Sequence, residues 1–223
     1  MGEMVQKIEK ILVISGGAIE ASFILKYIEE QKFDQIIAAD SGMEFLYRCG
    51  KKPAMIVGDF DSVDPAVLEA YRKTDGIEWK VLRPEKDDTD TESAVPTAAE
   101  LGAEEIHIVG GTGSRLDHML ANVYLLGLLR EQGISAYLVD AHNRVQVIDQ
   151  RIVIKKETQY GKYVSLLPFM GAVEGITLKG MKYPLEDYTL DHCHSIGISN
   201  EITGEQAEIE LRTGRLVVIE SKD

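Results

Sequence analysis

Cysteine, tryptophan and proline are scarce in this sequence, which has two cysteines, one tryptophan and six prolines among 223 residues. The cysteines, Cys49 and Cys193, do not have the spacing of a metal site, and we expect both to be reduced thiols. No apolar run approaches the ~20 residues that a membrane-spanning helix needs. No basic region followed by an apolar stretch stands at the N-terminus. We therefore predict a cytoplasmic protein with no membrane partner.

Positive charge is in short supply, because 24 lysines and arginines face 37 aspartates and glutamates, giving a net charge of −13. Phosphate backbones are bound by surfaces rich in lysine and arginine, so this balance argues against nucleic acid as a partner. Residues 1–149 hold 26 acidic and 15 basic residues, so most of the excess lies there. An acidic protein that handles phosphates needs a metal ion between the like charges.

Two common phosphate-binding motifs are also missing. The sequence has no GxxxxGK[ST], which excludes a P-loop kinase. The dinucleotide motif GxGxxG is not matched at Gly16-Gly17, and the stretch GTGSRL at 111–116 lacks the third glycine. A nicotinamide-dependent enzyme is therefore not expected.

The first 149 residues alternate short apolar runs, typical of buried strands, with helical patterns. We expect strands at 10–15, 35–39, 54–57, 78–82, 105–109 and 135–139, and helices at 18–31, 43–49, 65–73, 91–101 and 115–131. This alternation predicts a doubly wound, mostly parallel α/β sheet. Pro96 lies inside the fourth helix, which should therefore kink there or begin later.

The pattern changes near residue 145. Short strands are expected at 145–148, 151–155, 163–168, 173–178, 207–212 and 216–220, with no helix after residue 132. Such a series is typical of an antiparallel β-sandwich or barrel. We therefore predict an α/β domain over residues 1–149 and a β-sandwich or barrel domain over 150–223, packed directly together.

Acidic residues follow four of the expected strands. Asp40 follows the second, Asp59 and Asp61 follow the third, the segment KDDTD at 86–90 follows the fourth, and Asp117 lies beyond the fifth. The carboxyl ends of parallel strands share one edge of a sheet, so these carboxylates should meet there. Oxygen ligands of this kind suit Mg²⁺ shared with substrate phosphates. The alternative is an acidic rim that is only solvated.

The segment GGTGSRLDH at 110–118 follows a strand and opens a helix. Its glycines let backbone N–H groups approach an anion, and a helix N-terminus adds partial positive charge. Arg115 can bind phosphate oxygens with two parallel hydrogen bonds. Asp117 can hold a metal or accept a proton. His118 is either a proton shuttle or, as we favour, a structural or capping residue.

A third polar segment spans residues 191–201. His192, Cys193 and His194 have the residue types of a zinc site, but alternate residues of a strand point to opposite faces and no fourth ligand is near in sequence. A polar loop that hydrogen-bonds an organic ligand is the better interpretation.

These segments together resemble the thiamin pyrophosphokinase (thiamin diphosphokinase) family. The matching pieces are DSG at 40–42, GDFDS at 58–62, KDDTDTE at 86–92, GGTGSRLDHMLAN at 110–122 and GISNE at 197–201. Their order and spacing agree over nearly the whole chain. The resemblance implies an α/β nucleotide domain followed by a β-sandwich that binds thiamin.

The resemblance also implies an activity and an assembly. Family members transfer the pyrophosphoryl group of ATP to the hydroxyl of thiamin with Mg²⁺, giving thiamin diphosphate and AMP. They resemble one another in forming homodimers, with thiamin bound where the α/β domain of one subunit meets the β domain of the other. The expected partners are thus ATP, thiamin and a second copy of the chain.

Site residues carry over motif by motif. The resemblance implies a Mg²⁺ site at Asp59, Asp61 and Asp90, and a catalytic set completed by Asp117, as general base or metal ligand, and Arg115. On the ATP side it implies Asp40, Lys86, Asp88, Gly111, Thr112, Gly113, Arg115 and Asn122, and on the thiamin side Ser195, Ser199 and Asn200. Tyr183 and Tyr188 are candidates for an aromatic residue that stacks on thiamin.

Two other functions fit the same residues. One is a Mg²⁺-dependent nucleotide phosphohydrolase, in which water takes the place of thiamin. The other is a nucleotide or vitamin sensor without catalysis.

Overall fold

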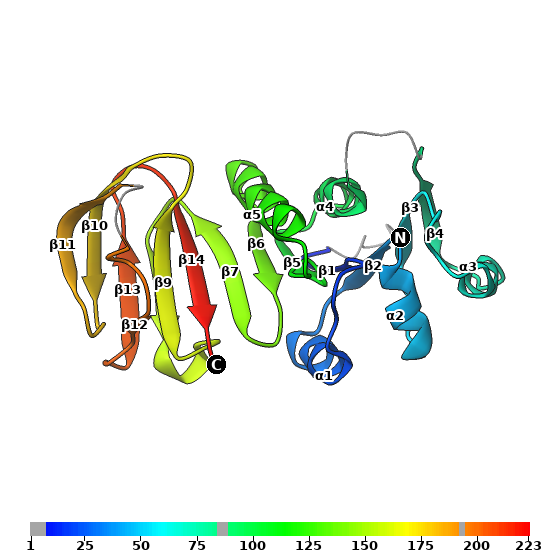
Figure 1. Ribbon diagram of the computed structural model, residues 1–223, viewed down its shortest axis with the longest axis horizontal. Helices are drawn as coiled ribbons and strands as arrows, with labels where there is room; N and C mark the ends of the chain where they lie inside the picture. Colours follow the sequence, from blue (N-terminus) through cyan, green and yellow to red (C-terminus); the bar gives the residue numbers. More distant parts are fainter. Residues whose placement is uncertain (1–7, 84–88, 192–194) are drawn as a thin grey trace, which may run out of the picture.

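The computed structural model describes residues 8–83, 89–191 and 195–223. Its helices and strands form one large mixed sheet with helices on both faces at one end and a second sheet at the other (Figure 1). The strands of the first half are β1 Lys10–Ile14, β2 Gln35–Ala39, β3 Met55–Gly58, β4 Glu78–Val81, β5 Glu105–Val109 and β6 Ser135–Val139. The helices are α1 Ala21–Gln31, α2 Gly42–Arg48, α3 Pro65–Arg72, α4 Asp90–Glu100 and α5 Leu116–Glu131.

The strands of the second half are antiparallel and short. They are β7 Asn143–Ile148, β8 Ile152–Lys155, β9 Tyr163–Pro168, β10 Val173–Lys179, β11 Leu185–Leu190, β12 Asn200–Glu201, β13 Gln206–Glu210 and β14 Leu216–Ser221, with one turn of 3₁₀ helix at Lys156–Thr158. Strands β11 and β12 were not expected. That 3₁₀ turn is short, and the described residues after 132 contain no α-helix, as predicted.

The large sheet has ten strands in the order β12-β9-β14-β7-β6-β5-β1-β2-β3-β4. Strands β6, β5, β1, β2, β3 and β4 pair in parallel, while β6 pairs with β7 in antiparallel fashion. Strands β11, β10, β13 and β8 form the second sheet. The predicted fold class, a mostly parallel α/β unit followed by an antiparallel sandwich, is confirmed.

Helices cover both faces of the parallel strands because these strands are apolar on both sides. In β1 every residue from Ile11 to Ile14 is fully buried. Residues of α4 and α5 pack on one face, and residues of α1, α2 and α3 pack on the other. Figure 1 shows the two helical layers on opposite sides of the sheet. A third apolar core, which includes Val164, Ile176 and Leu216, fills the space between the two sheets of the sandwich.

Local sequence explains where the helices of the site begin. Helix α3 starts as predicted, with the Asp64 carboxylate accepting a hydrogen bond from the Ala66 N–H at 2.8 Å and Pro65 in the first position. Helix α4 starts at Asp90, behind a reciprocal cap between Thr89 and Glu92. It continues through Pro96 to Glu100, so the expectation that this helix begins later is wrong.

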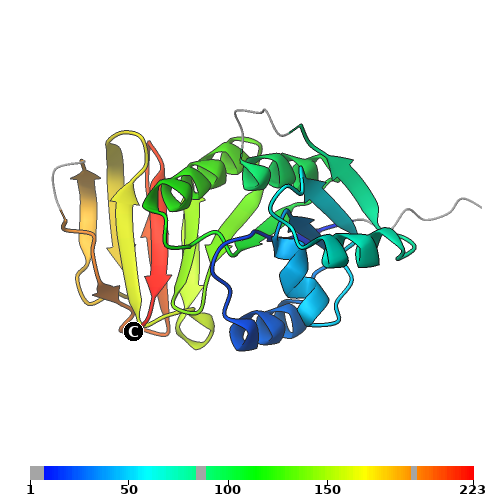
Figure 2. The same ribbon diagram turned by 45° about the vertical axis from the view of Figure 1, so that its right-hand side comes forward.

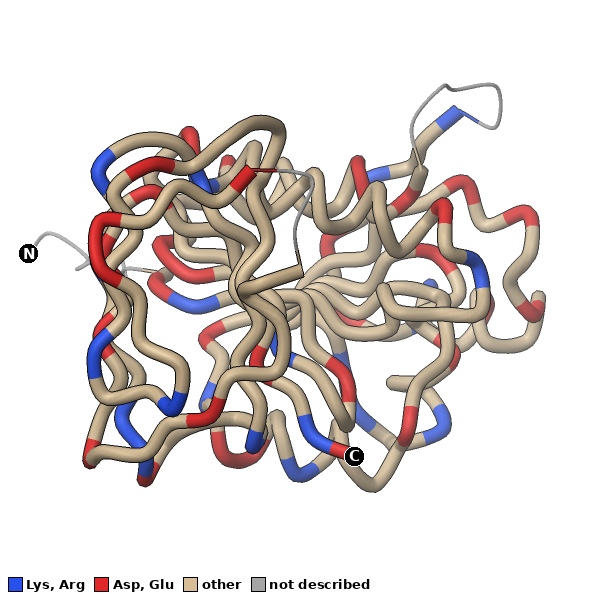
Figure 3. Tube along the Cα trace, turned by 60° about the vertical axis from the view of Figure 1, so that its left-hand side comes forward, with Lys and Arg blue, Asp and Glu red and all other residues tan. Residues whose placement is uncertain are grey.

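Charged residues lie over both halves of the molecule (Figure 3). Figure 2 shows that β9 and β14 continue the plane of β7 and β6. None of the helices in the described ranges is long and apolar enough to cross a membrane.

Candidate active site

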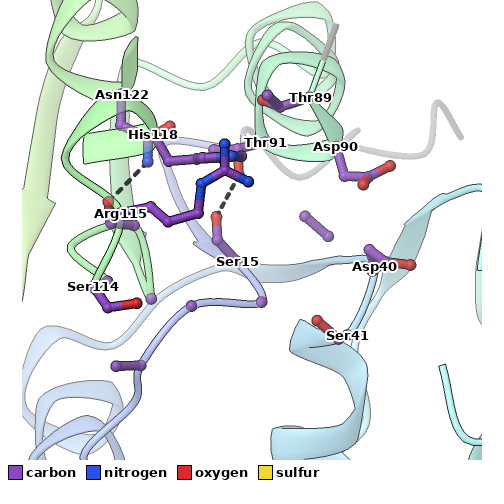
Figure 4. A pocket seen from close by; sticks show the side chains of 17 residues that line it. Ser15, Asp40, Ser41, Thr89, Asp90, Thr91, Ser114, Arg115, His118 and Asn122 are labelled. Carbon is purple, nitrogen blue, oxygen red and sulfur yellow. Dashed lines mark hydrogen bonds between the residues drawn. The ribbon is translucent and has the colours of Figure 1, made fainter. Parts of the chain in front are cut away.

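A cavity of about 480 Å³ opens at the carboxyl ends of β1, β2 and β5. Figure 4 shows the polar side chains that surround it. They come from four places along the chain: the loop after β1, the end of β2, the start of α4, and the loop that leads into α5. Its lining residues are Ser15, Gly16, Gly17, Ala18, Ala39, Asp40, Ser41, Thr89, Asp90, Thr91, Gly110, Gly111, Gly113, Ser114, Arg115, His118 and Asn122.

Two glycine loops form one wall of this cavity. The Ser15 N–H donates to the Val109 carbonyl at 2.9 Å, and the Gly17 N–H donates to the Gly110 carbonyl at the same distance. The loops approach so closely that a Cβ added at Gly17 would lie 2.2 Å from the Gly110 oxygen. Gly16-Gly17, which does not match the dinucleotide motif, was not expected in the site, yet both glycines line the cavity. Two glycines directly follow a buried strand, but this pattern fits a simple turn equally well.

Asp40 directly follows β2 and lines the cavity. Its backbone adopts a left-handed conformation with φ 45°, and its N–H donates to the Val57 carbonyl at 2.8 Å. The Ser62 hydroxyl donates to Asp40 Oδ2 at 2.7 Å, whereas Oδ1 is buried with no hydrogen-bond partner within the described residues. A buried carboxylate oxygen without a partner is costly, and a cation would satisfy it.

Asp59 and Asp61 do not line the cavity, but they lie in the same acidic region. The Asp61 N–H donates to Asp59 Oδ1 at 3.2 Å. The pKa of Asp61 is raised, chiefly by the charge of Asp59 and further by those of Asp40 and Asp90. Asp61 therefore interacts with a carboxylate of its own segment and with carboxylates of two others, whereas Asp117, expected at the same edge, pairs with Arg115 instead.

The oxygen-only character of this group suits Mg²⁺, which binds one or two carboxylates together with waters and substrate phosphates. Within residues 8–83, 89–191 and 195–223, no three acidic, histidine or cysteine side chains form a complete metal-ligand set. The Mg²⁺ site at Asp59, Asp61 and Asp90 stays a prediction. Lys86 and Asp88 lie outside the described residues.

Arg115 and Asp117 form an ion pair at the start of α5. Arg115 Nη2 lies 2.5 Å from Asp117 Oδ2, and Arg115 Nε donates to Asp117 Oδ1 at 3.2 Å. The hydrogen bonds from Arg115, together with one from the His118 N–H at 3.0 Å, lower the pKa of Asp117 to about 2. Asp117 is therefore a charged and very weak base while this pair is intact.

Asn122 shapes the cavity from behind the glycine loop. Its buried side-chain amide donates to the Gly111 carbonyl at 2.9 Å and so ties α5 to the loop (Figure 4). His118 lines the cavity and is exposed. Thr112, although expected on the ATP side, faces two neighbouring cavities instead of this one.

The three residues expected on the thiamin side do not line this cavity. Asn200 is buried, and its side chain makes two hydrogen bonds with the backbone of Tyr183. Its Oδ1 accepts a hydrogen bond from the Tyr183 N–H at 3.0 Å, and its Nδ2 donates to the Tyr183 carbonyl at 2.8 Å. Ser199 and Ser195 are exposed. His192, Cys193 and His194 lie outside the described residues.

Two family models match the chain. Thiamin pyrophosphokinase, catalytic domain, matches residues 26–138, and thiamin pyrophosphokinase, vitamin B1 binding domain, matches residues 149–216. The chain belongs to the thiamin pyrophosphokinase family. Thiamine pyrophosphokinase of Bacillus subtilis (strain 168) is 31% identical over 187 residues, which cover 84% of this chain and 87% of that protein.

Solved structures of the thiamin pyrophosphokinase family agree with this assignment. The crystal structure of thiamine pyrophosphokinase from Bacillus subtilis superimposes with a TM-score of 0.86 at 28% identity, covering 96% of this chain and 100% of that one. Thiamin pyrophosphokinase from Geobacillus thermodenitrificans gives a TM-score of 0.82 at 28% identity, with 96% and 98% covered.

Proposed function

We propose that this chain transfers the pyrophosphoryl group of ATP to the hydroxyl of thiamin, giving thiamin diphosphate and AMP in a Mg²⁺-dependent reaction. The match of both family models carries the proposal, and a glycine-walled cavity bordered by Asp40 and Asp90 supports it. The division into a nucleotide part, residues 1–149, and a thiamin part, residues 150–223, belongs to the same proposal.

The residues that would hold Mg²⁺ are Asp59, Asp61 and Asp90, with Asp40 beside them. The support is electrostatic, because like charges raise the pKa of Asp61 and Asp40 Oδ1 has no partner within the described residues. When bound, Mg²⁺ neutralises charge on the phosphoryl oxygens. These aspartates thereby let an acidic protein bind a polyphosphate.

The glycine loops and the N-terminus of α5 would hold the phosphates. Backbone N–H groups at a helix N-terminus favour anions, and glycines allow phosphate oxygens to come close. The guanidinium of Arg115, which lines the cavity, offers two parallel hydrogen bonds to phosphate. Such positioning for in-line attack accounts for much of the catalysis in phosphoryl transfer.

The guanidinium of Arg115 pairs either with the Asp117 carboxylate or with phosphate oxygens. When phosphate oxygens draw the guanidinium away, Asp117 loses the hydrogen bonds that lower its pKa and becomes a stronger base. The carboxylate is then able to accept the hydrogen bond of the thiamin hydroxyl. In this proposal, nucleotide binding prepares the acceptor side of the reaction.

The thiamin side belongs to the second half of the chain, through Ser195, Ser199 and Asn200. Asn200 acts there as a positioning residue, since its side chain fixes the backbone of Tyr183, a residue that is 57% exposed. Because these residues do not line the nucleotide cavity of their own chain, the proposal places thiamin between two subunits.

An apolar surface on α5 supports a homodimer. Leu116, Leu120, Tyr124 and Leu128 repeat every fourth residue and are 45–68% exposed. Leu120 and Tyr124 line a groove of about 500 Å³ whose other walls include Leu167 of β9 and Met170, which follows that strand. We call the exposed side chains of residues 116, 120, 124, 128, 167 and 170 the α5 apolar surface. An exposed apolar surface of this kind favours contact with another chain.

The test is incubation of the protein with ATP, Mg²⁺ and thiamin, with AMP and thiamin diphosphate measured. AMP formation that depends on thiamin supports the transferase. Phosphate release without thiamin indicates a hydrolase, and binding without turnover indicates a sensor. Either of the last two results contradicts the proposal.

A further inference from the structure

We propose that Phe60 is a positioning residue for the candidate metal site, and that its buried ring sets the directions of the Asp59 and Asp61 side chains. This inference rests on the proposed function, in which these aspartates hold Mg²⁺. Phe60 stands between them, just after the end of β3, and it is 8% exposed, whereas Asp61 is exposed. A side chain anchored in the core limits the directions that its two neighbours can take.

The backbone of Phe60 adopts an unfavourable conformation. Its φ is 64°, in the left-handed region that bulky residues rarely occupy. Glycine would adopt this conformation without a steric cost. Strain of this kind persists only where the surrounding structure enforces it, and it is concentrated at functional sites. The ring of Phe60 therefore contributes something that a glycine at this position would not.

The ring of Phe60 is held by its neighbours in the apolar core. It makes an edge-to-face contact with the ring of Trp79 on β4, with a centroid distance of 5.5 Å and an interplanar angle of 81°. A Cβ added at Gly58 would lie 3.0 Å from Phe60 Cε1 and 3.1 Å from Asp40 Cα. The ring and the Asp40 backbone thus both pack closely on this glycine. Phe60 therefore connects the turn after β3 with the residue that follows β2.

The turn after β3 is anchored at two points. Phe60 and Val63 are both buried in the same core, and the exposed Asp61 and Ser62 lie between them. The Ser62 hydroxyl donates to Asp40 Oδ2 at 2.7 Å, so the turn also orients the carboxylate of the neighbouring strand end. Carboxylates supported in this way can bind a cation with little loss of conformational freedom, and metal affinity depends on such outer support.

The first experiment measures Mn²⁺ binding without substrate, by the electron paramagnetic resonance of the free ion, so that the result does not depend on turnover. Phe60→Leu keeps most of the buried apolar volume and removes the ring. It should weaken Mn²⁺ binding by about tenfold, a usual effect of losing the outer support of metal ligands. Phe33→Leu removes a ring from the same core at the opposite end of the sheet, before β2, and as the matched control should leave Mn²⁺ binding unchanged.

The second experiment uses Trp79. Trp79→Leu removes the edge-to-face contact with the Phe60 ring, so it should raise the Mg²⁺ concentration needed for half-maximal AMP formation severalfold and leave the KM for thiamin unchanged. Trp79→Phe keeps an aromatic ring there and should restore the normal Mg²⁺ requirement. A merely structural role for this contact would lower the thermal stability of Trp79→Leu without changing the Mg²⁺ requirement of the folded protein.

Unchanged Mn²⁺ binding in Phe60→Leu, or equal weakening in Phe33→Leu, overturns the inference. An equal Mg²⁺ requirement in the two Trp79 variants does the same. Both results leave the proposed function intact if the unchanged protein binds Mn²⁺ and forms AMP only with thiamin. Failure of the unchanged protein to bind Mn²⁺ contradicts the metal site of the proposed function and this inference with it. If Phe60→Leu does not fold, the two Trp79 variants decide the matter.

Discussion

At the scale of single residues, Asp40 and Asp59 could be expected near one another because each directly follows an apolar strand. Asp40, Asp59 and Asp61 needed only the rule that parallel strands end at one edge. Two interactions could not be predicted, because they depend on side-chain directions set by the folded backbone. They are the ion pair of Arg115 with Asp117 and the hydrogen bonds of Asn200 with the Tyr183 backbone. Ser15 and Gly16-Gly17 were missed because two glycines alone do not distinguish a turn from a ligand loop.

Asp61→Asn tests the acidic region. Removal of one charge from the group should lower pyrophosphoryl transfer by at least about 100-fold, the usual scale for loss of one electrostatic contact to a reacting group. The fold should be unchanged, because the Asp61 side chain is exposed. Steady-state kinetics with varied Mg²⁺ measures the effect, and the exposed Asp75→Asn is the control. Activity within threefold of normal would remove Asp61 from the metal site.

Arg115→Ala tests the ion pair directly. Since hydrogen bonds from Arg115 are the main cause of the low pKa of Asp117, their loss should raise that pKa towards its ordinary value. The His118 N–H bond remains, so the pKa should stay below that of an ordinary aspartate. Carboxyl chemical shifts in an NMR titration measure it. An unchanged titration would show that the pair does not form in solution.

At the scale of elements, regular patterns were readable and irregular ones were not. Strand β11 was missed because its apolar alternation is broken: Asp187 has φ 45°, and the pairing of β10 with β11 shifts register twice. Helix α4 was predicted within one residue at each end, yet its tolerance of Pro96 was not expected. The Thr89–Glu92 cap stabilises the first turn, before the bond that Pro96 cannot donate.

Thr89→Ala measures what this cap contributes. Loss of the side-chain bond to the Glu92 N–H should lower the free energy of unfolding by about 1 kcal/mol, and Thr89→Ser should restore most of it. Urea denaturation provides the comparison. Because Asp90 is the first residue of α4, the alanine variant should also need more Mg²⁺ for half-maximal activity. Equal stability of the alanine and serine variants would contradict the role of the cap.

At the scale of the whole molecule, the order of fold types was predictable but the joining of the two halves was not. A change from alternating helices and strands to short strands alone indicates two architectures. It does not reveal that β7 hydrogen-bonds to β6, because that pairing depends on the tight turn at 140–142.

Leu120→Asp tests the proposed homodimer. A charge in the middle of the α5 apolar surface should convert dimer to monomer in sedimentation velocity, because burying an unpaired carboxylate between chains is unfavourable. Activity should fall as well if thiamin binds between subunits. Val153→Asp, at an exposed apolar residue on β8, should remain dimeric. A variant with an unchanged sedimentation coefficient would place the interface elsewhere.

The ten-stranded sheet has a mechanical consequence. Strand β7 pairs with β14 through six residue pairs, from Leu216 with Ile148 to Ser221 with Asn143, so β14 covers the outer edge of β7. A protein truncated after residue 149 would expose β7 as an unpaired edge strand, which favours aggregation with other chains. Two-domain enzymes usually close on a substrate by hinge bending between their domains. In this molecule such bending would have to break hydrogen bonds between β7 and β14. Shielding of the reaction from water must then come from loops or from the second subunit of the proposed homodimer.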